Sequence, residues 1–489
     1  MNIINLTQQT LKDIPAQLKR PSYNREEVKT GIVHIGVGGF HRAHQAFYAD
    51  ELMEMSGNLD WGICGVGLRE ADRKITEVFE KQDNLYTLII RHPNGHIESR
   101  VIGSLVEYIL AVDQPQEAID KLASEQTKIV SLTITEGGYN INASGEFDTE
   151  NAEIQHDLKF PDKPKTVFGF LTAALKKRKD ANLAAFTLMS CDNVAHNGEV
   201  AKSVLLTFAN MQDPDLAKWI EENVAFPNSM VDRITPVTTP EDITYLKEVY
   251  GLNDLWPVTC EPFIQWVIED KFSCSRPAFE EVGAQFVPDV APYEKMKLRL
   301  LNAGHSVLGI PAAIHGHPTI HACMEDTVFS SFMRKFMDEE ATPTLDELVG
   351  INLTAYKDTL EERFTNPNIK DSVARICSES SAKLPKFLIP TLLANLQGGG
   401  SIKYATFILA AWCYYSDVAL NRHQQPIEII DSLEEKLHLA AQGTNHDVLS
   451  FLRLEEIFGD LSQNATFTDL YSQYIHEIYK NPDIRRLMI

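Results

Sequence analysis

The chain has 489 residues, of which 44% are hydrophobic and 23% are charged, so we expect a folded protein of two domains and not a disordered chain. Its 68 Asp and Glu residues outnumber its 45 Lys and Arg residues, which gives a formal net charge of −23. This charge repels nucleic acid phosphates and anionic membranes, so we expect a small-molecule substrate and neither nucleic acid nor a membrane as a partner.

Residues 1–20 mix charged residues into their apolar positions and lack the continuous apolar core of a secretory signal. No apolar run in the chain reaches the roughly 18 residues that a membrane-spanning helix needs. The seven cysteines are dispersed and contain no C-x-x-C pair, which suits a reducing compartment better than a disulfide framework. We therefore expect a cytoplasmic protein.

Residues 31–39 are typical of a short buried strand that ends in a glycine turn, and the residues that follow have helical spacing. A strand, a glycine turn and a helix begin a dinucleotide-binding unit, although this motif is partial because His41 occupies its sixth position. Gly36 would permit the tight turn, and Gly38 and Gly39 would let the main chain approach the pyrophosphate. The alternative is a purely structural turn. The candidate cofactor-binding residues are Ile35, Gly36, Val37, Gly38, Gly39, Phe40 and His41.

A second strand is expected over residues 61–68, and an acid or base near its end should select the cofactor. Glu70 is the candidate acid for the ribose hydroxyls, whereas the adjacent Arg69 could contact the 2′-phosphate of NADP. Glu70 follows Gly36 by 34 residues, against the usual roughly 20, which implies an extended first crossover. We expect NAD as the cofactor, with NADP as the alternative.

Further β-rich apolar runs occur at residues 86–90, 129–135 and 184–190, separated by segments of helical spacing. This alternation predicts an α/β fold with a mostly parallel, doubly wound sheet of the Rossmann type. Towards the C-terminus, apolar residues recur at helical spacing almost throughout, which predicts an all-α domain. We place a dinucleotide-binding Rossmann-type domain at residues 1–290 and a mainly helical substrate and catalytic domain at residues 291–489.

Polar side chains follow two of these strands, at the carboxyl ends where open α/β sheets collect their ligands. Asn193 follows the strand at 184–190, and Glu136 follows the strand at 129–135 within a glycine-rich turn. Each could serve a reaction or simply form a turn. No G-x-S-x-G elbow is present, which disfavours acyl transfer.

Lys297, Asn302 and His305 fall within nine residues that are typical of one helix. At roughly 100° per residue, Asn302 lies about 140° and His305 about 80° around the helix from Lys297, so all three can face one cleft. Oxidising an alcohol without a metal needs a base for the hydroxyl proton and neutral donors for the developing oxyanion, and a desolvated lysine can be that base. The alternative is an ordinary amphipathic helix with a solvated lysine, a capping asparagine and a core histidine.

Two histidine clusters suggest a different class of function, a metal-dependent hydrolase or lyase. His41 and His44 form an H-x-x-H pair without a third ligand nearby in the sequence. The second cluster spans a turn and the helix expected after it, and it comprises His315, His317, His321 and Cys323. We expect neither cluster to hold a metal.

Six motifs resemble, in their order, those of the polyol-specific long-chain dehydrogenase/reductase family: GVGGFHRAHQ, ITEGGYN, SCDN, FPNSMVDRITP, EPFIQWVIED and KLRLLNAGHS. Each motif is weak alone, but six in order are specific, and the resemblance extends from near residue 30 to near residue 480. It implies a metal-independent, NAD(P)-dependent interconversion of a polyol and its ketose. It also implies an N-terminal Rossmann-type domain and a helical C-terminal domain.

The resemblance implies roles for four catalytic residues. Lys297 is similar to the family's catalytic lysine, which takes the hydroxyl proton in its neutral form. Asn193 and Asn302 match the asparagines that hold the reacting oxygen, and His305 matches the histidine that fixes the substrate. In the reverse direction, the ammonium form of Lys297 would donate its proton to the ketose carbonyl.

Five further residues match the family by motif. Asp232 corresponds to an acidic residue on the substrate side. Arg375 and Lys383 correspond to substrate contacts from the helical domain. Glu294, one turn before the catalytic lysine, and Glu136 would assist proton movement to solvent.

The reaction expected from the resemblance is the oxidation of D-mannitol by NAD to D-fructose and NADH. Within the family, the alternatives are oxidation of D-arabinitol or sorbitol, and reduction of a hexuronate such as fructuronate or tagaturonate, which would need an extra cation for the carboxylate. A nucleotide-sensing protein without chemistry is a further alternative. We find no coiled-coil pattern or internal repeat, and we expect a monomer or a small homo-oligomer.

Overall fold

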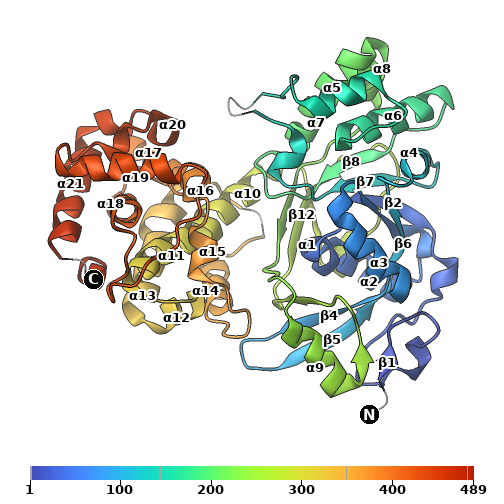
Figure 1. Ribbon diagram of the computed structural model, residues 1–489, viewed down its shortest axis with the longest axis horizontal. Coiled ribbons are helices and arrows are strands. Elements are labelled where there is room, and N and C mark those ends of the chain that lie inside the picture. The colour runs from blue at the N-terminus through green and yellow to red at the C-terminus, as the bar shows by residue number, and fades with distance from the viewer. Residues whose placement is uncertain (1–2, 143–145, 349, 482) are drawn as a thin grey trace. The chain divides into compact units, whose positions relative to one another are not determined.

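The computed structural model describes residues 3–142, 146–348, 350–481 and 483–489. The chain divides into two compact units. Unit 1 comprises Met1–His92 and His96–Ala291, and unit 2 comprises Pro93–Gly95 and Pro292–Ile489. Parallel strands form the centre of unit 1, whereas unit 2 is built from helices (Figure 1).

The centre of unit 1 is a five-stranded sheet in which every neighbouring pair is parallel. The strands in spatial order are β6 (Leu105–Leu110), β3 (Gly62–Gly67), β2 (Thr30–Ile35), β7 (Ile129–Leu132) and β8 (Thr187–Ser190). The chain moves outward from β2 through β3 to β6 and then returns to the other side of β2 as β7. The strand order therefore reverses between β2 and β7, and ligands of doubly wound sheets bind beyond the carboxyl ends of the strands at such a reversal.

Hydrophobic cores pack on both faces of this sheet, because successive side chains of a strand point to opposite faces. Val33 and Ile35 of β2 join one core, and Ile32 joins the other. The first core is covered by α4 (Pro115–Ala123), α6 (Val167–Asp180), α7 (Asn197–Gln212) and α8 (Pro214–Asn223). The second is covered by α1 (Gly39–Ala43), α2 (Gln45–Ser56) and α3 (Arg73–Gln82). The predicted doubly wound, Rossmann-type sheet is confirmed.

The alternation of strands and helices predicts that the apolar run at residues 86–90 joins the parallel sheet. This prediction is wrong, because the run lies in a separate sheet. It belongs to β4 (Tyr86–Arg91), which pairs antiparallel with β5 (Ile97–Ile102) and parallel with β11 (Val258–Cys260) in a separate sheet. The cause is the short turn at residues 92–96, because a hairpin reverses the chain whereas a parallel neighbour requires a long crossover. The third parallel strand is β6 instead.

Smaller elements complete unit 1. They are the sheet of β13 (Gln285–Val287), β12 (Gln265–Glu269) and β9 (Ser229–Asp232), the pair of β1 (Ile4–Asn5) and β10 (Leu252–Asn253), and the helices α5 (Ala152–Lys159) and α9 (Pro240–Tyr250). Thr239 and Asp242 form a capping box at the start of α9, and Gly251 ends this helix at a φ of 63°. The limits of α9 are thus fixed by local sequence.

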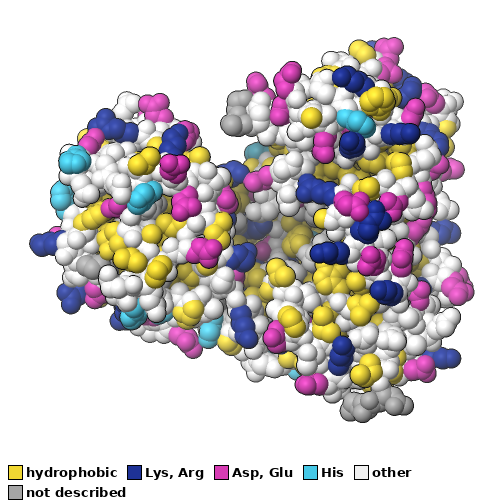
Figure 2. Space-filling view, in the orientation of Figure 1, with side chains coloured by type: hydrophobic (Ala, Val, Ile, Leu, Met, Phe, Trp, Pro, Cys, Tyr) yellow, Lys and Arg dark blue, Asp and Glu magenta, His cyan; other side chains and the backbone are white. Residues whose placement is uncertain are grey.

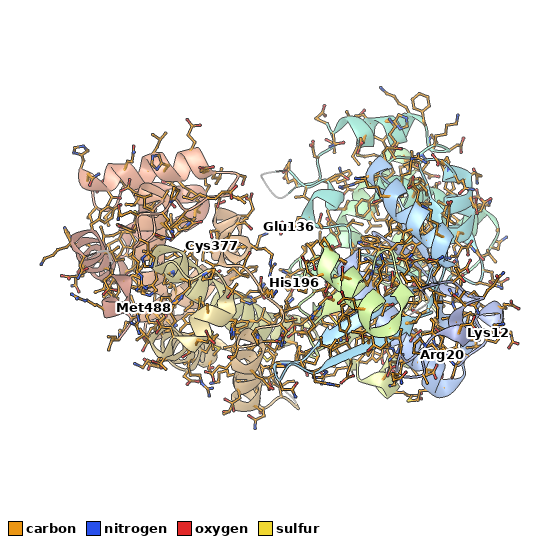
Figure 3. The ribbon with its side chains drawn as sticks, turned by 60° about the horizontal axis from the view of Figure 1, so that its bottom comes forward. Lys12, Arg20, Glu136, His196, Cys377 and Met488 are labelled. Carbon is orange, nitrogen blue, oxygen red and sulfur yellow. The ribbon has the colours of Figure 1, made fainter. Side chains whose placement is uncertain are left out.

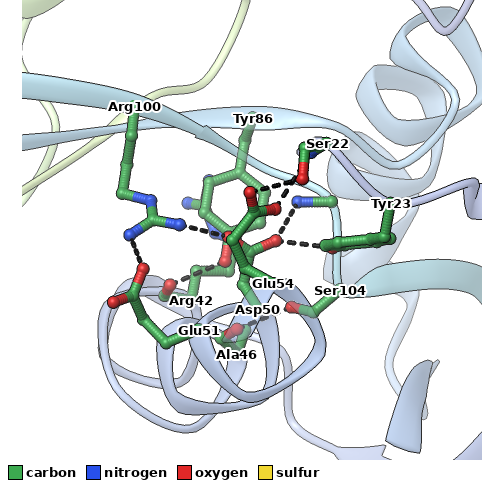
Figure 4. A network of polar contacts seen from close by, with 11 residues as sticks. Ser22, Tyr23, Arg42, Ala46, Asp50, Glu51, Glu54, Tyr86, Arg100 and Ser104 are labelled. Carbon is green, nitrogen blue, oxygen red and sulfur yellow. Dashed lines mark hydrogen bonds and ion pairs between the residues drawn. The ribbon is translucent and has the colours of Figure 1, made fainter. Parts of the chain in front are cut away.

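A buried network of charged and hydroxyl groups attaches α2 to the neighbouring sheet (Figure 4). The Asp50 carboxylate accepts hydrogen bonds from the Tyr23 hydroxyl at 2.6 Å and from the Gly103 N–H at 2.8 Å. It also pairs with the Arg100 guanidinium at 2.7 Å, and Arg100 contacts Glu51 in turn. Because α2 follows α1 and the glycine turn directly in the chain, this network fixes the helix next to the predicted cofactor site.

Unit 2 is helical, which confirms the predicted all-α domain. Its α-helices are α10 (Ala291–Lys297), α11 (Ala303–His315), α12 (Ile320–Glu325), α13 (Thr327–Phe336), α14 (Leu353–Phe364), α15 (Val373–Cys377), α16 (Ser380–Phe387), α17 (Ile389–Gly398), α18 (Lys403–Val418), α19 (Glu434–Gln442), α20 (Glu455–Phe458) and α21 (Ala465–Lys480). Residues Tyr404 to Ser416 of α18 are all buried, so this helix forms the core against which α11, α19 and α21 pack.

The face of the molecule shown in Figure 2 carries Lys and Arg side chains interspersed with Asp and Glu. On this face the basic side chains do not gather into one continuous patch. In the part of the chain that the structure describes, no helix combines the length and the apolar character needed to cross a membrane.

Candidate active site

The glycine turn directly follows β2, at the carboxyl edge of the parallel sheet and beside β7. Gly36 has a φ of 95°, and its carbonyl oxygen accepts a hydrogen bond of 2.7 Å from the Thr133 hydroxyl. A Cβ on Gly36 would lie 2.2 Å from the Thr133 carbonyl oxygen, so only glycine fits there. A Cβ on Gly38 would instead find the Gly36 carbonyl oxygen, at 3.9 Å, as its nearest non-adjacent neighbour. The main chain at Gly38 is therefore open to a close approach, as the pyrophosphate of a dinucleotide requires.

A pair of buried imidazoles lies beside this turn. The rings of His34 and His41 stack with their centroids 3.5 Å apart, and the two ring nitrogens of His34 lie 2.8 Å from the hydroxyls of Ser131 and Thr133. Burial lowers the pKa of His34 to about 3 and the pKa of His41 well below its usual value. Both rings are therefore neutral at physiological pH. The side chain of His41 belongs to the core, so its main chain is the part of this predicted residue that can contact a cofactor.

The other predicted turn residues offer main-chain groups as well. Ile35 and Val37 are buried, and Phe40 is half-buried. Arg42 would suit a phosphate by charge, but it is buried too. Its guanidinium lies 3.8 Å from the centroid of the Trp256 ring and donates to the Trp256 carbonyl oxygen at 2.6 Å. We conclude that the turn would bind a pyrophosphate through its N–H groups.

Carboxylates gather just beyond β3, where the cofactor-selecting acid was predicted. Glu70 is exposed and pairs with Arg73 at 2.5 Å, and this hydrogen bond lowers the pKa of Glu70. Arg73 also pairs with Asp113 at 2.7 Å, and Asp72 accepts a hydrogen bond from the Arg69 N–H at 2.9 Å. Sequence reasoning missed Asp72 and Asp113, and the latter is distant in the chain. Three carboxylates in this region disfavour an additional 2′-phosphate and so favour NAD over NADP.

Glu136 and Asn193 follow β7 and β8, so both belong to the sheet edge that carries the glycine turn. Both side chains are exposed, and Glu136 opens a short 3₁₀ turn, where Figure 3 labels it. The buried Asp192, next to Asn193, accepts hydrogen bonds from the Thr135 N–H and the Tyr139 hydroxyl, both at 2.8 Å. Asp192 thereby joins the ends of β7 and β8. The motif SCDN includes this residue, but sequence reasoning gave it no role.

Asp232 is the last residue of β9 and is buried. The start of β9 is joined to the end of β8, because the Ser229 hydroxyl donates to the Ser190 carbonyl oxygen at 2.7 Å. The Asn197 amide strengthens this junction by donating to the Ser229 carbonyl oxygen, also at 2.7 Å. Asp232 thus lies three residues along a strand that is anchored beside the end of β8.

Lys297, Asn302 and His305 lie on one continuous helical run of α10, a π-helical segment at Leu298–Asn302, and α11. The predicted helix is confirmed, but the spacing of 100° per residue does not hold across the wider π turn. Such π segments are rare and often occur at functional sites. Lys297 is only 7% exposed, and the predicted proton-relay residue Glu294 is half-buried in the first turn of α10.

Two cations next to Lys297 on this run have partners on the surrounding surface. Lys295 pairs with Asp346 at 2.9 Å, and Arg299 donates to a main-chain carbonyl oxygen at 3.1 Å. Asn302 differs, because its Oδ1 atom is buried and has no hydrogen-bond partner among the described residues. A buried polar atom without a partner is unfavourable, so this amide is suited to contact a ligand.

His305 is linked to both predicted substrate-side cations of unit 2. Its ring stacks on Phe364 with centroids 4.1 Å apart, and its Nε2 lies 3.9 Å from the Asp371 carboxylate. Asp371 also accepts a hydrogen bond of 2.7 Å from Arg375. Lys383 donates to the Arg375 carbonyl oxygen at 3.3 Å, and burial lowers the pKa of Lys383. Sequence reasoning missed Phe364 and Asp371, which lie outside the six motifs.

The second histidine cluster of the sequence is not assembled as a four-ligand site. His321 and Cys323 hydrogen-bond to main-chain carbonyl oxygens instead. Within the described residues, His315 and His317 group with Asp326, which the sequence analysis did not consider. The spacing of histidines along the chain was therefore a poor guide to which ligand atoms lie together.

Two family models match most of the chain. A mannitol dehydrogenase Rossmann domain matches residues 30–281, and a mannitol dehydrogenase C-terminal domain matches residues 289–484. The mannitol 2-dehydrogenase of Neosartorya fischeri is 45% identical over 452 residues, which cover 91% of this chain and 90% of that protein. The mannitol 2-dehydrogenase of Pyricularia oryzae is 43% identical over 490 residues, which cover 97% of each chain.

Two solved structures are similar over nearly the whole length. The ternary complex of Pseudomonas fluorescens mannitol 2-dehydrogenase with NAD and D-mannitol has a TM-score of 0.89 and 43% identity, and the match covers 99% of each chain. A D-sorbitol dehydrogenase in substrate-free form has a TM-score of 0.91 and 37% identity, and the match covers 99% of this chain and 100% of that one. The likeness therefore includes both units.

Proposed function

Because the chain belongs to the mannitol dehydrogenase family, we propose that it is an NAD-dependent enzyme that interconverts D-mannitol and D-fructose. The observation that carries this proposal is the helical run of unit 2. It combines the buried amine of Lys297 with the buried Oδ1 of Asn302, which has no hydrogen-bond partner in the described part of the chain, at a π-helical distortion. The similar Pseudomonas fluorescens enzyme was solved with NAD and D-mannitol, which supports the choice of cofactor and substrate.

We assign dinucleotide binding to residues 1–290 and the substrate and catalytic groups mainly to residues 291–489. The fit of unit 1 to a dinucleotide rests on Gly36, whose turn excludes any Cβ, and on Gly38, whose main chain is open. Glu70 would bind the ribose hydroxyls once its ion pair with Arg73 is replaced by hydrogen bonds to the ligand. When bound, NAD supplies the acceptor for the hydride that leaves the carbinol carbon.

The chain's own groups handle the proton and the oxygen. Lys297, in its neutral form, takes the hydroxyl proton of the polyol, and as an ammonium it returns the proton to the ketose carbonyl. Asn193 and Asn302 donate hydrogen bonds from their amide NH2 groups to the reacting oxygen without adding a full charge, and the Asn302 Oδ1 accepts a hydrogen bond from a substrate hydroxyl. Glu136 and Glu294 pass the proton on to solvent. A metal is not needed in this scheme, because these groups supply both the base and the oxyanion donors.

The remaining polar residues hold the polyol chain. His305 fixes a substrate hydroxyl, and Asp371 and Phe364 hold its ring from two sides. Arg375 and Lys383 act as donors to further hydroxyls, and Asp232, which the structure buries at the end of β9, acts as an acceptor. Polyols are recognised by such paired donors and acceptors, because each hydroxyl can both donate and accept.

We further propose that the protein works in the cytoplasm, as a monomer or a small homo-oligomer. All seven cysteines are free, and six of them are buried, which suits a reducing compartment. Size-exclusion chromatography with light scattering measures the oligomeric state directly. A large assembly would contradict this part of the proposal.

D-Sorbitol is a second candidate substrate, because a D-sorbitol dehydrogenase matches the whole chain with a TM-score of 0.91. Sorbitol and mannitol differ in configuration at one carbon. Discrimination between them therefore depends on individual hydroxyl contacts, which are each worth only about 0.5–1.5 kcal/mol. We expect a preference for D-mannitol together with measurable activity on D-sorbitol.

A substrate panel tests the proposal. Purified protein is assayed with D-mannitol, D-sorbitol and D-arabinitol in the presence of NAD or NADP, and with fructose or fructuronate in the presence of NADH. The expected result is the highest kcat/KM for D-mannitol with NAD, unchanged after dialysis against a chelator. A higher kcat/KM with fructuronate, or loss of activity with the chelator, would overturn it. NADH binding without any turnover would indicate a nucleotide-sensing protein.

A further inference from the structure

The hairpin that joins β4 to β5 carries three potential metal ligands outside the residues assigned to catalysis. His92 donates its N–H to the His96 carbonyl oxygen at 2.9 Å, so these two residues lie opposite each other at the end of the hairpin. Glu98 lies two residues further along the strand and pairs with Ile90. Because side chains alternate along a strand, His92, His96 and Glu98 share one face of the ladder.

The distances between the ligand atoms suit a small cation. Glu98 Oε1 lies 2.9 Å from His92 Nε2 and 3.7 Å from His96 Nε2, and one ligand atom of each residue lies within 4.8 Å of the others. Tetrahedral zinc with bonds of about 2.0–2.2 Å keeps its ligands roughly 3.3 Å apart. Small adjustments of the three side chains would therefore bring their ligand atoms to bonding distance. Imidazole and carboxylate ligands favour zinc and other late first-row divalent ions.

Accessibility and charge also favour this cluster. The side chains of His96 and Glu98 are 61% and 55% exposed, so a hydrated ion can reach them, and the net charge of −23 attracts cations. The other histidine group, of His315, His317 and Asp326, is less suitable. Arg485 donates to the Asp326 carboxylate at 3.0 Å, and Arg422 lies 3.2 Å from His315, so positive charge already occupies that cluster.

We propose that His92, His96 and Glu98 form a binding site for Zn²⁺ or a similar divalent ion, with a fourth position filled by water. The ion would cross-link the two strands of the hairpin and is separate from hydride transfer. Because the ligands come from adjacent strand positions, the site is preorganised by the ladder.

Isothermal titration of the NADH-loaded protein with zinc chloride tests this site. The expected result is that His96→Ala and Glu98→Gln each bind one equivalent fewer than wild type, or bind it at least about 10-fold more weakly, because even the loss of a residue that only supports a metal ligand costs about 10–100-fold in affinity. His476→Ala, which removes another exposed histidine, serves as the matched control and should bind like wild type. Melting temperatures without zinc confirm that all variants are folded. Equal zinc binding by wild type and His96→Ala would overturn the proposal.

A second, independent observation concerns the backbone after β7. Thr135 has a φ of 59° and a ψ of 171°, a region that is almost confined to glycine and is unfavourable for a β-branched residue. The Asp192 carboxylate holds this conformation through the N–H groups of Ile134 at 3.2 Å and Thr135 at 2.8 Å. The Tyr139 hydroxyl adds a third hydrogen bond to the same carboxylate, at 2.8 Å.

We infer that Asp192 is a positioning residue that sets the places of Glu136 and Asn193. Glu136 follows the strained Thr135 directly, and Asn193 follows Asp192 directly, so a change at this carboxylate moves both. Strained backbone of this kind persists only where the surroundings hold it, and it often occurs at functional sites. This inference rests on the proposed function, because it concerns the reaction assigned to these two residues.

The substitution Asp192→Asn tests the inference. An amide keeps the shape but replaces one acceptor oxygen with a donor, so the turn at Thr135 should relax and kcat for D-mannitol oxidation should fall at least about 10-fold. The Kd for NADH should stay within about 2-fold, because the glycine turn is held by other contacts. Asp242→Asn is the matched control, since Asp242 is also buried and accepts a main-chain N–H, at 2.8 Å.

The outcomes separate this inference from the proposed function. A kcat loss in Asp192→Asn but not in Asp242→Asn, at similar melting temperatures, supports the positioning role. Full kcat in Asp192→Asn, or losses in both variants that follow the melting temperature, would contradict it. If wild-type protein does not oxidise D-mannitol at all, then the proposed function itself has failed.

Discussion

The glycine turn of unit 1 and the helical run around Lys297 in unit 2 are built from opposite kinds of group. In the turn, the predicted residues offer main-chain groups, and the geometry is set by steric limits at Gly36. In the helical run, the important groups are side chains, and they include a buried amine and a buried amide atom. The cofactor region should therefore respond mainly to added bulk, whereas the catalytic run should respond to removed atoms.

The largest effect is expected from removing the amine of unit 2. Lys297→Ala should lower kcat by about 10²–10⁴-fold, because a positioned base contributes that much to proton transfer. NADH binding, measured by fluorescence titration, should stay nearly unchanged. Lys295→Ala is the matched control, since its partly exposed ion pair with Asp346 contributes little, and it should keep nearly full activity. Comparable losses of kcat in Lys297→Ala and Lys295→Ala would show that Lys297 is not the specific base.

Two glycine substitutions test the prediction that the cofactor region of unit 1 responds mainly to added bulk. Gly38→Ala should leave the melting temperature nearly unchanged, because its Cβ meets no non-adjacent atom closer than 3.9 Å. It should nevertheless raise the Kd for NADH at least about 10-fold by blocking the close approach of the pyrophosphate. Gly36→Ala should destabilise the fold by several kcal/mol, on the order of the largest single-residue effects, because of its φ of 95° and the clash with Thr133. Wild-type NADH affinity in Gly38→Ala would show that this main chain does not face the cofactor.

The buried histidine beside the glycine turn predicts a dependence of stability on pH. The pKa of His34 is lowered to about 3 in the folded protein, whereas an unfolded histidine titrates near 6.5. As the pH falls between these values, the unfolded chain binds a proton that the folded chain does not, so stability is lost by up to about 1.4 kcal/mol per pH unit. Urea unfolding at several pH values should show that the free energy of unfolding falls less steeply with decreasing pH in His34→Gln than in wild type. An identical slope in both proteins would mean that His34 takes up a proton without unfolding.

The smallest effect is expected at the carboxylate that joins His305 to Arg375. Asp371→Asn keeps the size of the side chain but weakens its contacts with both partners, which lie at 3.9 Å and 2.7 Å. The KM for D-mannitol should rise about 10-fold, equivalent to about 1.4 kcal/mol of binding, with a smaller change in kcat. Asp346→Asn, which removes the carboxylate that pairs with Lys295 at the surface, is the control. An unchanged KM in Asp371→Asn would show that the substrate does not depend on this link.

The fold could be predicted from the sequence where a local pattern determines the structure. The glycine turn after β2 was recognisable because strand, turn and helix follow one another within a few residues. The alternation of strands and helices gave the doubly wound sheet, and helical spacing gave the all-α unit. The run at 86–90 was misassigned because its partner strand, β5, is defined by a short turn and not by its own apolar pattern.

The candidate site was less accessible to sequence reasoning, because several of its contacts join residues that are far apart in the chain. Asp371 contacts His305, and Asp192 contacts Thr135, yet neither pair is adjacent in sequence. The π-helical segment after Lys297 was also missed, since its residues have an ordinary helical pattern. The ligand atoms of His92 and Glu98 were recognisable only once the register of the hairpin was known, because that register places both side chains on one face.

If Lys297 is the base of the reaction, its ionisation should govern the pH dependence of kcat/KM for D-mannitol oxidation. In wild type, kcat/KM should rise with pH along a single ionisation, because only the neutral amine accepts the hydroxyl proton. In Lys297→Ala, the remaining rate should be at least about 100-fold lower and should lack that ionisation. A Lys297→Ala variant that keeps both the rate and the pH profile of wild type would show that Lys297 is not the base.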